Sequence, residues 1–317
     1  MARMDLRVRL LGRLVGLASV AHLDEARLRK LQQRRIGHNR LTDLLFGAVA
    51  RGVRTADGTA KGEAGPVPIR TYRPADADTA ALPLVVNFHG GGWTVGNLDA
   101  ADWLASQVAV TTRAVVVSVD YRLAPGHRFP AAAEDCYAAL VDAVGRAQEF
   151  GADPDRVAVM GESAGGNLSA VVSLMARDRS GPGIAHQGLL YPAVDLTMSS
   201  PSVERNAHAP ILTKADMLAF RDHYIDEPDY RNPYASPLFA DDLAGLPPAL
   251  VQVAEHDPLR DEGIRYAERL RGAGVPTRLT EYVGMPHGYL NFPRICRAAP
   301  QALAELVAEQ RAALSSS

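Results

Sequence analysis

The chain has 317 residues, of which 47% are hydrophobic and 22% are charged, so it can bury one large core. Its net charge of −2 offers no basic surplus for nucleic acid or for an anionic membrane surface, and we expect neither as a partner. The two cysteines are too few for a disulfide framework, so we expect both to stay reduced. No cluster of cysteine and histidine in the sequence indicates a metal site.

The first 50 residues predict helices rather than a targeting signal. Residues 10–21 are apolar but are interrupted by Arg13, whereas the hydrophobic segment of a secretion signal is continuous. No apolar run is long enough to span a bilayer, and residues 23–35 have the pattern of a charged amphipathic helix. We therefore expect a cytoplasmic protein without stable membrane insertion.

Short apolar runs further along the chain predict the strands of one sheet. They cover residues 67–72, 84–88, 114–120, 156–160, 187–191, 249–254 and 278–283. Helical stretches separate most of these runs, which favours an α/β fold with a mostly parallel, doubly wound sheet. The stretch 195–235 breaks this rhythm and predicts an insertion. Within it, Thr213 and Asp216 resemble a capping pair at the start of a helix over 214–226.

The first motif with chemical content is His-Gly-Gly-Gly-Trp at residues 89–93, directly after a predicted strand. Glycine has no side chain to shield its amide, so the N–H groups of Gly91 and Gly92 can approach an oxyanion. A phosphate-binding loop is the alternative interpretation, but the sequence lacks the usual phosphate-loop patterns. We expect His89 to brace the loop rather than to act as a base.

The second motif, Gly-Glu-Ser-Ala-Gly at residues 161–165, places Ser163 at a sharp turn between a predicted strand and a predicted helix over 164–178. The start of that helix directs free N–H groups and a positive dipole end toward the serine. The pattern predicts that Ser163 is a nucleophile and that the N–H of Ala164 is a third oxyanion donor. The alternative is a serine that only caps the helix.

A nucleophilic serine needs a base, which in this type of fold follows it in the chain. His287 lies in a turn-rich loop just after the strand predicted over 278–283, where a base is expected. His256 is a poor base, because it would have to reach Ser163 from the loop that must supply the acid. The sequence therefore predicts His287 as the base.

The base needs an acid that orients it, on the loop after the preceding strand. Asp257 follows the strand predicted over 249–254, and Pro258 keeps it extended and outside the next helix. Glu255 is the second candidate, and Asp195 is a distant third. We expect Asp257 to fix the tautomer of His287 and to stabilise its imidazolium form.

Taken together, the motifs resemble those of the hormone-sensitive-lipase-like esterases, the bacterial family IV carboxylesterases of the α/β-hydrolase superfamily. The glycine loop, the serine motif, residues 257–262 and His287-Gly288 carry the resemblance, as do residues 121–125 and 129–135. It implies a serine esterase that acts on short- to medium-chain acyl esters without a cofactor. Two positions depart from the family pattern: Glu162 stands where many members have Asp, and Gly126 stands where many have Glu.

The resemblance also implies how the chain is divided. Residues 1–50 and 195–235 would form a helical cap, and residues 51–194 and 236–317 would form the hydrolase core. The residues that would line the acyl pocket are Trp93, Leu212, Met217, Phe220 and Arg221. An ordinary core-facing stripe on the cap helix is the alternative. A homodimer through the last strand and the last helix is a further expectation, because members of the family often assemble in this way.

The sequence thus predicts a carboxylesterase with a Ser163–His287–Asp257 triad. An amidase, a lactonase or a deacetylase on the same scaffold is an alternative that fold and triad cannot separate. A small-molecule receptor that has lost catalysis is a second alternative, but such a protein would lack the nucleophile or the base, and both are present here.

Overall fold

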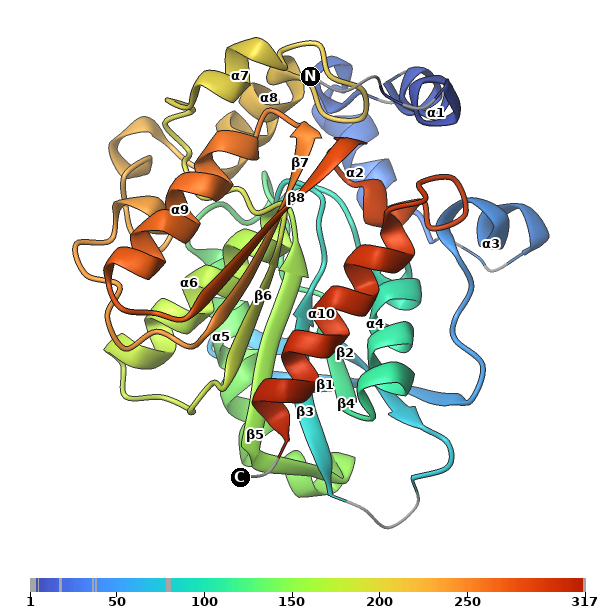
Figure 1. Cartoon of the computed structure of the whole chain (residues 1–317), viewed down its shortest axis with the longest axis vertical. Coiled ribbons are helices and arrows are strands. Elements are labelled where there is room, and N and C mark those ends of the chain that lie inside the picture. Colours follow the sequence, from blue (N-terminus) through green and yellow to red (C-terminus); the bar gives the residue numbers. More distant parts are fainter. Residues whose placement is uncertain are drawn as a thin grey trace.

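The centre of the molecule is an eight-stranded sheet (Figure 1). The computed structural model describes residues 4, 6–16, 19–35, 37, 39–77 and 81–315. The strands lie in the order β1-β2-β4-β3-β5-β6-β7-β8, and their bounds are β1 (Val53–Gly62), β2 (Gly65–Pro74), β3 (Leu82–Phe88), β4 (Val115–Val119), β5 (Ala152–Glu162), β6 (His186–Leu190), β7 (Ala249–His256) and β8 (Thr277–Pro286). β2 pairs antiparallel with β1 and β4, and the other neighbours are parallel. The predicted mostly parallel, doubly wound sheet is confirmed.

Each of the predicted apolar runs overlaps a strand, whereas β1 is absent from the prediction. β1 is mostly exposed, and its sequence shows no alternation of apolar residues. It pairs with β2 in a hairpin along its whole length, from Val53 opposite Pro74 to Gly62 opposite Gly65. A strand held by cross-strand hydrogen bonds rather than by burial leaves little signal in the sequence.

Two layers of helices cover the sheet (Figure 1). The five helices that pack on it are α4 (Leu98–Thr112), α5 (Ala131–Gly145), α6 (Ala164–Asp178), α9 (Arg260–Gly272) and α10 (Ala299–Leu314). α5, α6 and α9 cover one face, and α4 and α10 cover the other. In β3, Leu84 and Phe88 face the first layer and Val85 faces the second, all three fully buried. Burying a side chain of this size stabilises the fold by about 1.5–3 kcal/mol, so the sheet is a firm base for the loops at its ends.

Further helices lie outside these two layers, most of them near the carboxyl ends of β7 and β8 (Figure 1). They come from two distant parts of the chain, and their bounds are α1 (Leu6–Gly16), α2 (Glu25–Gln32), α3 (Arg40–Phe46), α7 (Pro201–Arg205) and α8 (Lys214–Tyr224). Short 3-10 turns complete the structure: η1 (Val20–His22), η2 (Ala147–Phe150), η3 (Glu227–Asp229), η4 (Pro237–Phe239) and η5 (Tyr289–Asn291). Within the described ranges, no helix is both long and apolar enough to cross a membrane.

The capping pair predicted for α8 forms a full capping box. The Thr213 side chain accepts from the N–H of Asp216, and the Asp216 carboxylate accepts from the N–H of Thr213. α8 ends at Tyr224 rather than at residue 226, because Ile225 is already extended. Asp216 also accepts from the hydroxyl of Ser19, which joins the two distant groups of outer helices.

The division of the chain into cap and core segments stays a prediction. Parts of the expected N-terminal cap, at residues 1–3, 5, 17–18, 36 and 38, lie outside the described residues, as do residues 316–317 of the core. Residues 17 and 18 belong to the apolar run 10–21, so part of that run also lies outside the described residues. Both cysteines are free and buried, as expected.

Candidate active site

Ser163 lies at the turn between β5 and α6 with a positive φ of 56°, a conformation that L-residues rarely adopt. The two glycines that flank it are required by close packing. A methyl group at Gly165 would lie 1.9 Å from the carbonyl oxygen of Phe88, and one at Gly161 would lie 2.3 Å from the carbonyl oxygen of Gly165. The Ser163 side chain makes no capping hydrogen bond to α6, so the interpretation as a mere helix cap is wrong.

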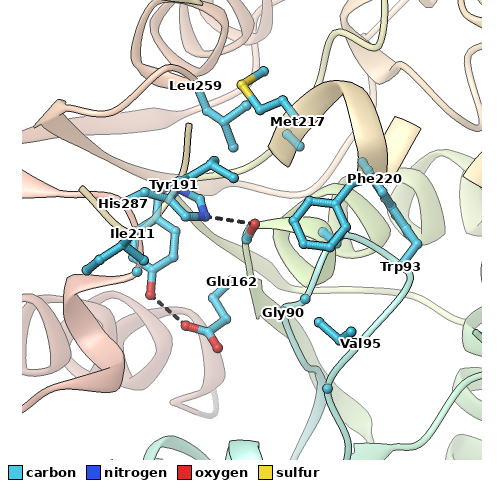
Figure 2. A pocket seen from close by; sticks show the side chains of 18 of the residues that line it. Gly90, Trp93, Val95, Glu162, Tyr191, Ile211, Met217, Phe220, Leu259 and His287 are labelled. Carbon is cyan, nitrogen blue, oxygen red and sulfur yellow. Dashed lines mark hydrogen bonds between the residues drawn. The ribbon is translucent and has the colours of Figure 1, made fainter. Parts of the chain in front are cut away.

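A chain of two hydrogen bonds joins the three predicted residues. Ser163 Oγ lies 2.9 Å from His287 Nε2, and His287 Nδ1 lies 2.7 Å from Asp257 Oδ2 (Figure 2 shows the first of these contacts). The Asp257 carboxylate can only accept, so the geometry favours a proton on Nδ1 and leaves Nε2 to accept from the serine. The other oxygen of Asp257 accepts from the N–H of Leu259 at 2.9 Å, which fixes the carboxylate.

The other candidate acids and the other candidate base are engaged elsewhere. Glu255 Oε2 accepts from the N–H of Gly284 at 2.8 Å. Asp195 accepts from neighbouring hydroxyls, with that of Ser199 at 2.6 Å. His256 Nε2 lies 4.0 Å from Glu255. Of the candidates, the structure brings Asp257 and His287 to the serine.

The glycine loop lies beside Ser163 and is shaped by positive φ angles. Gly91 has φ 121° and Gly92 has φ 58°. Their carbonyl groups accept bonds within the loop: the N–H of Val95 donates to Gly91 at 2.9 Å, and the hydroxyl of Thr94 donates to Gly92 at 2.8 Å. Both glycines line the same cavity as Ser163 and Ala164. The carbonyl oxygens of Gly91 and Gly92 are thus both engaged by donors of the loop itself.

His89 braces the glycine loop from behind. Its Nδ1 lies 2.8 Å from the carbonyl oxygen of Gly90, and its ring stacks on Tyr121 with 4.3 Å between centroids. Burial lowers the pKa of His89, so a neutral ring is favoured. The hydroxyl of Tyr121 in turn donates to the His89 carbonyl at 2.8 Å. This arrangement fits the bracing role expected from the sequence.

A cavity of about 310 Å³ opens above the serine, with mostly apolar walls. Four of the five predicted pocket residues line it, namely Trp93, Leu212, Met217 and Phe220. Figure 2 shows Met217 and Leu259 on one side of the His287 hydrogen bond, with Glu162 and Val95 on the other. The wall near the glycine loop is firm, because Trp93 stacks on Tyr224 with 4.5 Å between ring centroids.

Arg221 is a correction, because it is not among the residues that line the cavity. Its guanidinium lies over the ring of Tyr230, 4.4 Å from the centroid, and pairs with Asp222. Arg221 directly follows Phe220 in the sequence. Consecutive residues of a helix point to different sides, so Arg221 does not share the cavity-facing side of α8 with Phe220.

Sequence reasoning missed several residues of the cavity. Phe46 of α3 and Phe292 form an aromatic pair with ring centroids 5.7 Å apart and line one end of it. Glu262 also lies at the wall; it is fully buried and accepts from the N–H of Val194 at 2.7 Å. Burial raises the pKa of Glu262 well above its ordinary value. In the part of the chain that the structure describes, no group of three or more His, Cys, Asp or Glu could hold a metal ion.

The sequence matches the family described as "alpha/beta hydrolase fold" over residues 85–291. The chain belongs to the α/β-hydrolase family. This hydrolase is 45% identical to "Esterase LipI" of Mycobacterium tuberculosis (strain ATCC 25618 / H37Rv) over 266 residues, which cover 83% of each chain. It is also 45% identical to "Carboxylesterase NlhH" of the same organism over 252 residues, covering 78% of this chain and 79% of the relative. These relatives support the resemblance to the family IV carboxylesterases.

Solved structures extend the likeness to the whole chain. The ester hydrolase EH1AB1 from the metagenome of Lake Arreo has a TM-score of 0.89 and 35% identity, with 98% of each chain covered. An esterase from Pyrobaculum calidifontis has a TM-score of 0.83 and 38% identity, also with 98% of each chain covered. The solved structures and the sequence relatives therefore both indicate an α/β-hydrolase fold for this chain.

Proposed function

We propose that this carboxylic ester hydrolase cleaves its substrates with Ser163 as nucleophile, His287 as general base and Asp257 as the acid that orients the base. The observation that carries the proposal is the chain of hydrogen bonds of 2.9 Å and 2.7 Å that joins the three side chains beside the cavity. Distances of this size are those across which a serine hydroxyl can pass its proton to imidazole.

The reaction would proceed through an acyl-enzyme. Ser163 Oγ attacks the ester carbonyl while His287 Nε2 takes its proton, and the N–H groups of Gly91, Gly92 and Ala164 hold the oxyanion. The C–O bond to the alcohol then breaks, and His287 returns the proton to the leaving oxygen. Water, deprotonated by His287, attacks the acyl-serine and releases the acid. None of these steps requires a metal or an organic cofactor.

We further propose that the substrates are short- to medium-chain acyl esters. The cavity of about 310 Å³ lies near the lower end of the range for ligand pockets. Its apolar walls suit an acyl chain, and Met217 and Phe220 can adjust to chains of different length. The names of the two relatives, an esterase and a carboxylesterase, support the same substrate class.

The two groups of outer helices would form a cap over this cavity, as the expected division into residues 1–50 and 195–235 implies. Met217 and Phe220 of α8 contribute to the wall of the cavity, and Phe46 of α3 contributes from the N-terminal segment. The bond from Ser19 to Asp216 supports a cap in which both segments act as one unit. The homodimer and the cytoplasmic location stay predictions.

Hydrolysis of p-nitrophenyl esters from acetate to laurate, by wild type and by Ser163→Ala, tests the proposal. We expect turnover that peaks at short or medium chains and that disappears in the variant, while the variant keeps the wild-type melting temperature. Turnover that survives in Ser163→Ala would reject the nucleophile. A folded wild type without turnover would favour an amidase, a lactonase or a receptor instead.

A further inference from the structure

The carboxyl group of Glu162 lies directly beneath the nucleophile and is 7% exposed. Its Oε2 accepts from the hydroxyl of Tyr191 at 2.6 Å, the contact drawn at the lower left of Figure 2. Asn291 and the backbone of Gly90 also lie close enough to this carboxyl group to favour its ionised form and lower its pKa. A methyl group at Gly90 would lie 3.1–3.3 Å from Glu162 atoms, so the two residues are closely packed.

Tyr191, Asn291 and Gly90 each belong to a different part of the proposed catalytic apparatus. Gly90 begins the glycine loop, and Asn291 lies in η5, four residues after His287. Tyr191, at the end of β6, packs edge-on against the His287 ring with 5.0 Å between centroids. One carboxylate thus connects the loop of the proposed oxyanion donors, the turn of the proposed nucleophile and the loop of the proposed base.

We propose that Glu162 is a positioning residue whose ionised carboxylate holds the glycine loop and the His287 loop in register and stabilises the imidazolium form of His287. The inference rests on the proposed triad and adds a second carboxylate to it. Asp257 contacts Nδ1 of His287 directly, whereas Glu162 acts through space and through the hydrogen bond that it accepts from Tyr191.

The charges around Glu162 are consistent with an ionised group. Burial raises the pKa of Glu162 above its ordinary value, while the hydrogen bond from Tyr191, the neighbouring Asn291 and Gly90 and the charge of His287 limit that rise. The other titratable groups nearby are Tyr121, whose pKa is raised chiefly by burial and least by the Glu162 charge, and Asp257 beyond His287. A carboxylate near imidazole favours the protonated ring, which is the state formed when Ser163 attacks.

The length of the side chain matters as well as its charge. Glutamate carries one more methylene than the aspartate that many family members have at this position. From the backbone of the turn, that extra length lets the carboxylate reach the hydroxyl of Tyr191 while it stays packed on Gly90. Charge and reach can therefore be separated by two substitutions at the same site.

Glu162→Gln removes the charge and keeps the length. We expect kcat to fall about tenfold or more with little change in KM, because the groups displaced are positioning groups rather than substrate contacts. We also expect the acid limb of the kcat/KM profile to move to lower pH by about half a unit or more, because the imidazolium form loses a stabilising charge. A purely structural role would not move this limb.

Glu162→Asp keeps the charge and shortens the reach. It should leave the acid limb at the wild-type pH and lower kcat. Glu305→Gln is the matched control: Glu305 is a comparably buried carboxylate that accepts from the Tyr282 hydroxyl at 2.9 Å, but it does not line the cavity. We expect its kinetics and acid limb to match those of wild type.

Melting curves show whether each variant folds. If Glu162→Gln fails to fold, Tyr191→Phe supplies a second, milder perturbation of the same contact. Tyr191→Phe should lower kcat less than Glu162→Gln and leave the charge in place. Wild-type kcat and an unmoved acid limb in folded Glu162→Gln would overturn the inference while leaving the triad intact. A wild type with no ester turnover would instead overturn the proposed function.

Discussion

The catalytic residues and the outer helices of this hydrolase are held in place in different ways. Ser163, Asp257 and His287 follow β5, β7 and β8, strands of one sheet, and each is at most partly exposed. The outer helices are held against the core by side-chain contacts. Gln32 of α2 donates to the carbonyl oxygens of Thr94 and Ala124, both at 2.8 Å.

This difference indicates that the sheet positions the catalytic residues, whereas the outer helices shape the substrate cavity. A sheet with a continuous ladder of backbone bonds fixes the triad, whereas side-chain packing, as of Met217 and Tyr224, together with polar contacts such as those of Gln32 holds the cavity wall opposite. Substitutions in the first region should change the rate for every substrate. Substitutions in the second should change which substrate is preferred.

The largest effect should come from Asp257→Asn. The amide can no longer hold the proton on Nδ1 of His287, so we expect kcat/KM to fall by about 10³–10⁴-fold at every acyl chain length. Steady-state kinetics on the p-nitrophenyl series measures this. Glu255→Gln, two residues away, is the control and should keep most activity, because Glu255 accepts from Gly284 instead. Equal losses in both variants would contradict the assignment of the acid.

Gly92→Ala should disturb both regions at once. Gly92 has φ 58°, and a methyl group there would lie 2.3 Å from the ring of Phe220 on α8. We expect about a hundredfold loss of kcat, the effect of one misplaced oxyanion donor. Phe220→Ala in the same chain should restore part of it by removing the clash, which a double-mutant cycle measures. Strict additivity would show that loop and helix do not touch in solution.

Phe220→Ala alone should alter preference more than rate. Removing the ring enlarges the cavity, so we expect relative kcat/KM for long acyl chains to rise by about tenfold. Arg221→Ala is the matched control, since its guanidinium lies over Tyr230 away from the cavity. If both variants shift the chain-length profile alike, α8 is oriented differently from the structure described above.

The smallest effect should come from Asp216→Asn, which weakens the capping box and the bond from Ser19. We expect about 1 kcal/mol of lost cap stability, seen as faster hydrogen exchange in α2 and α8 with an unchanged triad. Unchanged exchange would mean that the two segments are not coupled through this carboxylate.

The same carboxylate predicts a pH dependence. Burial alone would raise the pKa of Asp216, but hydrogen bonds from Ser19 and Thr213 outweigh it and hold that pKa below its ordinary value of 3.8. A depressed folded-state pKa stabilises the protein above the pKa of the unfolded chain, and this contribution is lost as pH falls through the folded-state value. The protection factors of the α8 amides, which correct for the intrinsic pH dependence of exchange, should therefore fall only below about pH 4, and a fall already near neutral pH would contradict this account.

The sequence predicts the core of the site well because its signals are local. The glycines at 161 and 165 and the position of His287 just after a strand each reflect a constraint within a few residues. The pairing of Phe46 with Phe292 leaves no such signal, because it depends on how two distant segments meet. The prediction that Arg221 lines the pocket is wrong for a related reason: the side of α8 that faces the cavity depends on how the helix packs against the core.

Covalent labelling tests the central claim most directly. A p-nitrophenyl alkylphosphonate would be attacked at phosphorus by the nucleophile, releasing p-nitrophenolate and leaving a phosphonyl ester on the enzyme. Peptide mass spectrometry should find one such group, on Ser163, together with complete loss of ester turnover, and should find none in Ser163→Ala. Complete inactivation with the label on another residue, or an unlabelled Ser163 in an inactivated enzyme, would contradict the proposed mechanism.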